Sequence, residues 1–280
     1  VDYPGFNLIV AREAHRRGIP VFFYVAPQVW AWGKGRARRM AGFIDRLAVI
    51  FPFEEAIFNG YGRRFASYVG HPLLDGLVVS CDRADTRRQH GFDDVQPLLV
   101  LMPGSRRSEV RLLLPVMLRA AELLSNEGWQ VALVQAPTVP ESYLTQVAGG
   151  KLQVPLIRGD TYNLLAAADV GLIASGTATL EAALLGCPPV IVYRFSWFTY
   201  LLARLVIGIR SMGLPNVVLG RSAFPELIQR KFKPVQLAQA VRDLAARRGL
   251  NRQLIDELRS KMGVAGASER AANLMLELLR

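Results

Sequence analysis

Short, almost entirely apolar runs recur along this sequence, and longer stretches with a helical pattern separate them. Runs without a polar face are typical of strands that are covered on both sides of a sheet. Strands that alternate with helices predict parallel sheets in doubly wound α/β layers. The runs are residues 21–26, 46–51, 98–102, 129–136, 169–174 and 189–193, and the clearest helical segments are residues 7–17, 114–125, 162–167 and 178–185.

The chain is long enough for two such domains, because it has 280 residues of which 51% are hydrophobic. A polar stretch at residues 81–97 follows Gly70-His71-Pro72. We therefore predict a first domain at 1–78 and a second at 79–280, the second including helices from residue 235 onward. The first domain holds fewer apolar runs than the roughly five strands of a doubly wound domain. We therefore expect the sequence to begin inside a domain.

The net charge is +11, from 34 basic and 23 acidic residues. A basic surface attracts nucleic acid, anionic lipid or phosphorylated substrates, and charge alone does not choose among them. The sequence has no motif that reads nucleic acid, so we expect no nucleic-acid partner.

The two cysteines, Cys81 and Cys187, have no metal-ligand spacing and are too few for a disulfide framework. We therefore expect no metal site and a reducing, cytoplasmic compartment. An uncharged apolar run of about 18 residues, which would predict a membrane-spanning helix, does not occur. The nearest candidate, residues 195–210, is interrupted by Arg204.

Two predicted strand-to-helix junctions share one design. Glycine lets the backbone approach a ligand, and free N–H groups at a helix start attract phosphate oxygens. An arginine can bind the same anion with two hydrogen bonds. Ordinary turns and helix caps also use glycine and serine, but the two junctions together favour a diphosphate site. Neither has the lysine of a P-loop or a GxGxxG fingerprint, so we expect no dinucleotide cofactor. The residues concerned are Gly104, Ser105 and Arg106 at the first junction, and Ser175, Gly176 and Thr177 at the second.

Glu181 lies about one helical turn after Thr177 in an otherwise apolar segment. A carboxylate on a mostly buried helix needs partners, and two ribose hydroxyls would supply them. The alternative is a surface glutamate that interacts with the helix dipole.

The first domain offers further candidates. Asp2 could be a general base, although lone aspartates are more often helix caps. Trp30 and Trp32 share one face of an extended segment and could stack on a sugar or lipid, or simply pack in a core. The basic segment that includes Lys34 and Arg36 could meet a phosphate or an anionic lipid, although most charge runs are only solvated.

Seven segments, in this order along the chain, make the sequence resemble the lipid-A-disaccharide synthase family, glycosyltransferases with the GT-B fold of two Rossmann-like domains facing a cleft. The blocks YVAPQVWAW and LPN are the most specific, whereas the ASGT block is shared with other GT-B enzymes. The segments are VDYPGFN (1–7), YVAPQVWAW (24–32), FPFE (51–54), GHPLLD (70–75), LMPGSRRSEV (101–110), ASGTATLEAALLGCPPVIVYR (174–194) and LPNVVLGR (214–221).

The resemblance implies an inverting transfer of 2,3-diacylglucosamine from UDP to 2,3-diacylglucosamine 1-phosphate, which forms a β-1,6 disaccharide without a metal. It implies that Asp2 is the base for the acceptor hydroxyl and that Arg106 stabilises the departing UDP. Glu181 would hold the ribose, and Asn216 in the LPN block would line the same cleft.

The family acts at the inner face of the cytoplasmic membrane, and its last helices pack back on the other domain and can exchange in a homodimer. It also carries further N-terminal residues, with a Gly-Glu-x-Ser-Gly-Asp loop that this sequence lacks. Two alternatives therefore stay open. One is another GT-B enzyme, such as an undecaprenyl-linked N-acetylglucosaminyl transferase or a UDP-sugar epimerase. The other is an inactive fragment that binds a nucleotide or a lipid.

Overall fold

The computed structural model describes residues 3–29, 35–194 and 213–278. Its contacts divide the chain into two compact units. Of the described residues, the first unit contains 3–29, 35–76 and 260–278, and the second contains 77–194 and 213–259. Residues 260–278 belong by their contacts to the first unit, whereas the domain boundary predicted from the sequence places them in the second.

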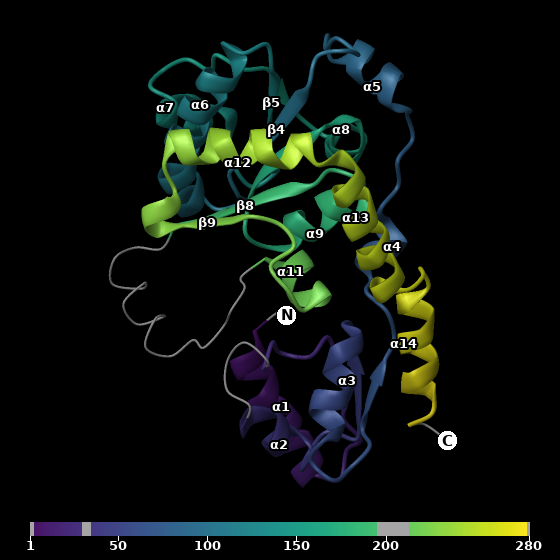
Figure 1. The fold of residues 1–280 in the computed structure, drawn as a ribbon. Coiled ribbons are helices and arrows are strands. Elements are labelled where there is room, and N and C mark those ends of the chain that lie inside the picture. Colours follow the sequence, from purple (N-terminus) through teal and green to yellow (C-terminus); the bar gives the residue numbers. More distant parts are fainter. Residues whose placement is uncertain (1–2, 30–34, 195–212, 279–280) are drawn as a thin grey trace. The chain divides into compact units, whose positions relative to one another are not determined.

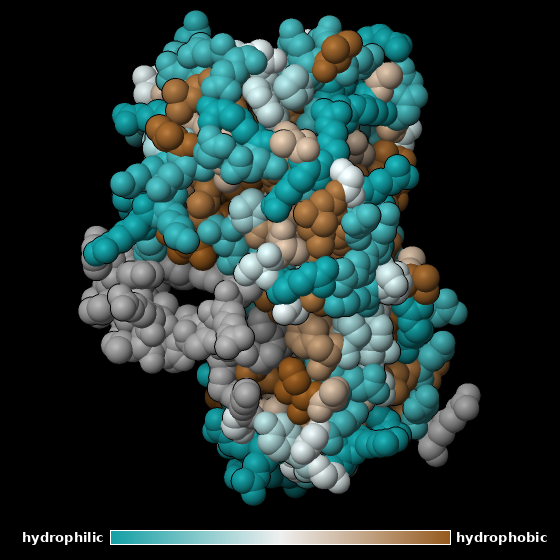
Figure 2. All heavy atoms as spheres, in the orientation of Figure 1, coloured by the Kyte–Doolittle hydropathy of each residue, from teal (hydrophilic) through white to brown (hydrophobic). Residues whose placement is uncertain are grey.

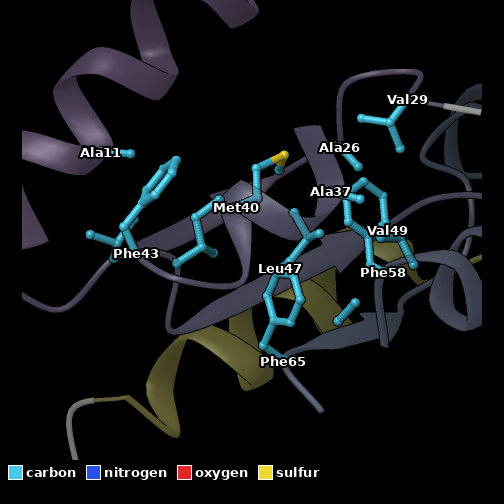
Figure 3. Packing of buried hydrophobic residues seen from close by; sticks show 13 residues of the cluster. Ala11, Ala26, Val29, Ala37, Met40, Phe43, Leu47, Val49, Phe58 and Phe65 are labelled. Atoms are coloured by element: carbon cyan, nitrogen blue, oxygen red, sulfur yellow. The ribbon is translucent and has the colours of Figure 1, made fainter. Parts of the chain in front are cut away.

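The first unit is built on a parallel sheet with the strand order β1-β2-β3. Leu47 and Val49 of β2 point to one face, where they pack with side chains such as Phe58 and Phe65 in an apolar cluster (Figure 3). The helices between the strands supply the rest of this layer. The elements are α1 (Pro4–Arg16), β1 (Phe22–Tyr24), α2 (Gly35–Met40), β2 (Arg46–Val49), α3 (Pro52–Asn59), β3 (Ala66–Tyr68) and α4 (Leu73–Gly76).

The opposite face of this sheet is covered by α14 (Ala267–Leu276), from the C-terminal end of the chain. Ala48, which alternates with Leu47 and Val49, packs there against Ala271 and Leu274. Asp75 fixes the start of the helix, because its carboxylate accepts hydrogen bonds from three backbone N–H groups at Gly266, Ala267 and Ser268. These bonds lower the pKa of Asp75, the one from Gly266 most strongly.

The second unit contains a parallel sheet with the strand order β6-β5-β4-β7-β8-β9. Residues 98–101 of β4 are all fully buried, as expected for a strand covered on both faces. The doubly wound α/β architecture predicted from the sequence is therefore confirmed. The strands are β4 (Leu98–Met102), β5 (Gln130–Val134), β6 (Leu156–Ile157), β7 (Val170–Ala174), β8 (Pro189–Tyr193) and β9 (Glu226–Ile228).

Helices lie against both faces of this sheet. The long helices α6 and α12 pack on each other and on β7, and α12 crosses the near side of the strands in Figure 1. On the visible face of this unit, hydrophilic residues surround small apolar patches (Figure 2). The helices are α5 (Arg83–Gln89), α6 (Arg107–Ser125), α7 (Glu141–Val147), α8 (Thr161–Ala167), α9 (Thr177–Leu184), α11 (Leu214–Leu219) and α12 (Pro234–Ala246), with a 3-10 turn at Gln229–Lys231; α13 (Arg248–Met262) runs into the first unit.

Three short strands, β3, β6 and β9, were not predicted from the sequence. None is longer than three residues, so none produces an apolar run. Among the residues that the structure describes, no helix is both long and apolar enough to cross a membrane. The segment 195–210 lies outside those residues.

Arg87 of α5 connects the two central strands of the second unit. Its fully buried guanidinium donates to Asp169 at 2.8 Å, and Asp169 Oδ2 also accepts the Leu98 N–H at 2.9 Å. Burial alone would raise the pKa of Asp169, but the Leu98 N–H and the neighbouring arginines lower it. The remaining Arg87 donors bond to the carbonyl oxygens of Ala167, Asp93, Asp94 and Gln96.

We predict that Arg87→Met lowers the free energy of unfolding by about 3–5 kcal/mol, because it leaves Asp169 and several carbonyl groups buried without this partner. Arg88→Met is the matched control, since the side chain of Arg88 is 75% exposed, and it should change stability by about 0.5 kcal/mol at most. Urea unfolding measures both. Equal losses in the two variants would contradict this role of Arg87.

Candidate functional site

A cavity of about 760 Å³ opens at the carboxyl ends of four neighbouring strands of the second unit. This edge is where open parallel sheets bind ligands. Both glycine-containing junctions line this cavity. That they share one ligand stays a prediction. The lining residues are 102–106 and Glu109 from the end of β4 onward, 134–137 from the end of β5, 159–163 after β6, 174–178 and Glu181 from the end of β7, and Val78 and Ser80.

The loop after β4 is held in a conformation that requires glycine. Gly104 has φ +108°, a value that side chains rarely allow, and a Cβ there would meet the side chain of Glu109. The Thr138 hydroxyl donates to the Ser105 carbonyl at 2.6 Å. The Arg106 guanidinium donates to Glu109 at 2.8 Å, although the Arg106 side chain is 77% exposed. These contacts therefore fix the conformation of the loop.

The loop after β7 presents the start of α9 to the same cavity. Gly176 has φ +152° and directly precedes the first helical residue, Thr177. The buried Thr179 hydroxyl donates to the Gly176 carbonyl at 2.7 Å, and the Ser175 N–H donates to Val192 on β8 at 2.8 Å. Because the first N–H groups of a helix have no partner within the helix, this end is suited to bind an anion.

Glu181 lies one turn farther along α9, where it lines the cavity and is half-buried. Burial raises the pKa of its carboxyl group. Burial raises the pKa of Tyr162 on α8, and the nearby negative charge of Glu181 raises it further. A partly desolvated carboxylate in a cavity is stabilised by hydroxyl donors, which fits the expected contact with a ribose.

The wall of the cavity that follows β6 was not predicted from the sequence. Asp160 accepts hydrogen bonds from Asn163 Nδ2 and contacts His90 Nε2, both at 2.6 Å. Asn163 Oδ1 in turn accepts the backbone N–H groups of Ser80 and Cys81. The strand before this wall, β6, has only two residues, so the sequence contains no apolar run that would predict it.

The structure corrects the role expected for Asn216. Its side chain is fully buried and does not line the cavity. Its amide nitrogen donates to the Phe224 carbonyl and to Glu226, both at 2.8 Å, and its oxygen accepts the N–H groups of Ala223 and Phe224. With these four bonds the LPN segment holds the turn between α11 and β9, which is a structural role.

Most of the site residues predicted in the first domain lie outside the described residues, namely Asp2, Trp30, Trp32 and Lys34. Arg36 is exposed on the short helix α2 of the first unit. The roles expected for these five residues stay predictions.

In the described part of the chain, no group of three or more His, Cys, Asp or Glu side chains is placed to hold a metal ion. Both cysteines are free, and Cys187 is buried.

Solved structures similar to this one share its fold. A putative UDP-N-acetylglucosamine 2-epimerase from Listeria monocytogenes gives a TM-score of 0.62 at 15% identity, covering 94% of this chain and 68% of that one. A structure described as an S. aureus MnaA-UDP co-structure gives 0.61 at 15% identity, covering 95% and 69%. At these identities the likeness concerns the fold alone, and it confirms the expected GT-B class.

Sequence comparisons identify the family. The family model described as lipid-A-disaccharide synthetase matches residues 1–275. A protein named lipid-A-disaccharide synthase from Syntrophus aciditrophicus (strain SB) is 44% identical over 287 residues, covering 100% of this chain and 75% of that protein. A protein of the same name from Myxococcus xanthus (strain DK1622) is 40% identical, covering 100% and 74%. The chain therefore belongs to the lipid-A-disaccharide synthetase family, glycosyltransferases of lipid A and lipopolysaccharide biosynthesis.

Proposed function

We propose that this chain transfers 2,3-diacylglucosamine from UDP to the 6-hydroxyl of 2,3-diacylglucosamine 1-phosphate, with inversion at the anomeric carbon. The observation that carries the proposal is the single cavity shared by both glycine-containing loops and Glu181. Such a cavity offers donors for a diphosphate at one place and an acceptor for ribose hydroxyls one helical turn away. The pattern fits a nucleoside diphosphate better than a free sugar.

In the proposed reaction, Asp2 removes the proton of the acceptor hydroxyl as its oxygen attacks the anomeric carbon. The bond from that carbon to the UDP oxygen breaks, and the electron pair leaves with UDP. Arg106 and the N–H groups at the start of α9 stabilise the negative charge that grows on the diphosphate. We assign the acceptor side to the first unit, with Trp30, Trp32, Lys34 and Arg36.

We further infer that the enzyme works at the inner face of the cytoplasmic membrane. Both proposed substrates carry acyl chains, and a net charge of +11 attracts anionic lipid. A homodimer stays an expectation from the resemblance. Among the alternatives, a putative UDP-N-acetylglucosamine 2-epimerase shares the fold. Neither an epimerase nor an undecaprenyl-linked transferase agrees with the family as the proposed reaction does.

The test is a transfer assay with the full chain that follows both UDP release and the disaccharide. We expect transfer by the unmodified chain and about a 100-fold lower turnover for Arg106→Ala, because it loses a donor to the leaving group. Arg119→Ala is the control, since Arg119 is exposed on α6 and is not among the residues that line the cavity. A folded chain that binds UDP but forms no disaccharide would contradict the proposal and favour a non-catalytic binding module.

The raised pKa of Glu181 predicts a pH dependence of nucleoside binding. Hydroxyl donors favour the ionised carboxylate, so uridine should bind more weakly as the pH falls through the raised pKa. Uridine is the suitable ligand because it carries no phosphate that titrates in this range. Calorimetric titration across mildly acidic pH measures the effect.

Glu181→Gln provides the matched control for this titration. It should bind uridine about tenfold more weakly at neutral pH and lose the pH dependence, because an amide does not ionise. A pH profile that is unchanged in Glu181→Gln would assign the titration to another group.

A further inference from the structure

Glu109 is a carboxylate beside the proposed diphosphate site, where its charge alone would repel the ligand. It lies on the first turn of α6, three residues after Arg106, and lines the cavity. Its side chain is only 14% exposed, whereas that of Arg106 is 77% exposed. Glu109 is therefore the buried member of this ion pair, and Arg106 is the member that solvent and ligand can reach.

The position of Glu109 is set by the loop itself. A Cβ built on Gly104 would lie 2.9 Å from the Cβ of Glu109 and would also meet its carboxylate. The glutamate therefore occupies the space that the missing side chain of Gly104 leaves. Glycine at this position serves two needs, its φ of +108° and the room for Glu109.

The hydrogen bond between the pair leaves most of the guanidinium available. Glu109 Oε1 accepts from Nη1 of Arg106 at 2.8 Å. A guanidinium has five N–H donors in a fixed plane, so fixing one edge orients the others. A long exposed arginine otherwise loses much side-chain entropy when it binds a ligand.

Tyr193, at the end of β8, lies near the same pair. Burial, and then the charge of Glu109, raise the pKa of Tyr193, and Arg106 offsets only part of this rise. The pair therefore lies near the end of β8, the neighbour of the strand β7 that leads into α9.

We propose that Glu109 is a positioning residue for the diphosphate, which acts by holding the Arg106 guanidinium toward the cavity. The inference rests on the proposed function, since it concerns the same ligand site. Glu109 does not touch the ligand, and its repulsion is outweighed because it preorganises the donor that binds the diphosphate. A purely structural alternative exists, in which Glu109 only stabilises the first turn of α6 through the helix dipole.

The experiment compares UDP with uridine in calorimetric titrations of the full chain. Glu109→Ala should weaken UDP binding about tenfold and leave uridine binding unchanged, because only UDP carries the diphosphate. Glu109→Gln should bind UDP within about threefold of the unmodified chain, since an amide oxygen can still accept from Arg106 and fits the same space. The rescue by glutamine also guards against loss of folding in the alanine variant.

A double-mutant cycle then separates positioning from a structural role. In an Arg106→Ala background, Glu109→Ala should cause no further loss of UDP affinity. Equal weakening of UDP and uridine, or a loss that persists without Arg106, would overturn the positioning role while UDP binding by the unmodified chain still supported the proposed function. Failure of the unmodified chain to bind UDP would overturn both.

Discussion

The pairing of β4 with β7 is the constraint on which the candidate site depends. These strands are neighbours at the centre of the second sheet, with Met102 opposite Ile173 in register. Each strand ends in a glycine-containing loop, so the pairing places the two loops next to each other at one cavity. At the other end of the same strands, the buried pair of Arg87 and Asp169 bonds to the start of β4. A buried ion pair therefore occupies one end of the two strands, and the cavity lies at the other end.

Three acidic side chains line this cavity among the residues described, and their surroundings give them different roles. Asp160 is engaged by His90 and Asn163, which fixes the wall after β6. Glu109 is engaged by Arg106. Glu181 is partly buried, and this burial raises its pKa. It is therefore the carboxylate best suited to accept hydrogen bonds from the hydroxyl groups of a ligand. A carboxylate in the proposed phosphate site is therefore compatible with anion binding when a cationic side chain such as Arg106 neutralises its charge.

Local signals made much of the second unit predictable from the sequence. The apolar runs of β4, β5, β7 and β8 predicted a parallel sheet, and glycine after two of them predicted loops that line the cavity. What depends on distant segments was not predictable. Helix α14 packs on β2 through residues that lie more than two hundred positions apart in the sequence, and no local pattern predicts this contact. Asn216 was misjudged because a polar residue in a distinctive motif suggests a ligand contact, whereas its four hydrogen bonds show a buried turn.

The central claim is that the ends of β4 and β7 together hold a diphosphate. Amide hydrogen exchange on the full chain, with and without saturating UDP, tests it most directly because a backbone N–H that donates to the diphosphate exchanges more slowly than one that faces water. The claim predicts slower exchange at residues 104–107 and 176–178 together, with little change along α12. Bound UDP without protection in either loop would contradict it.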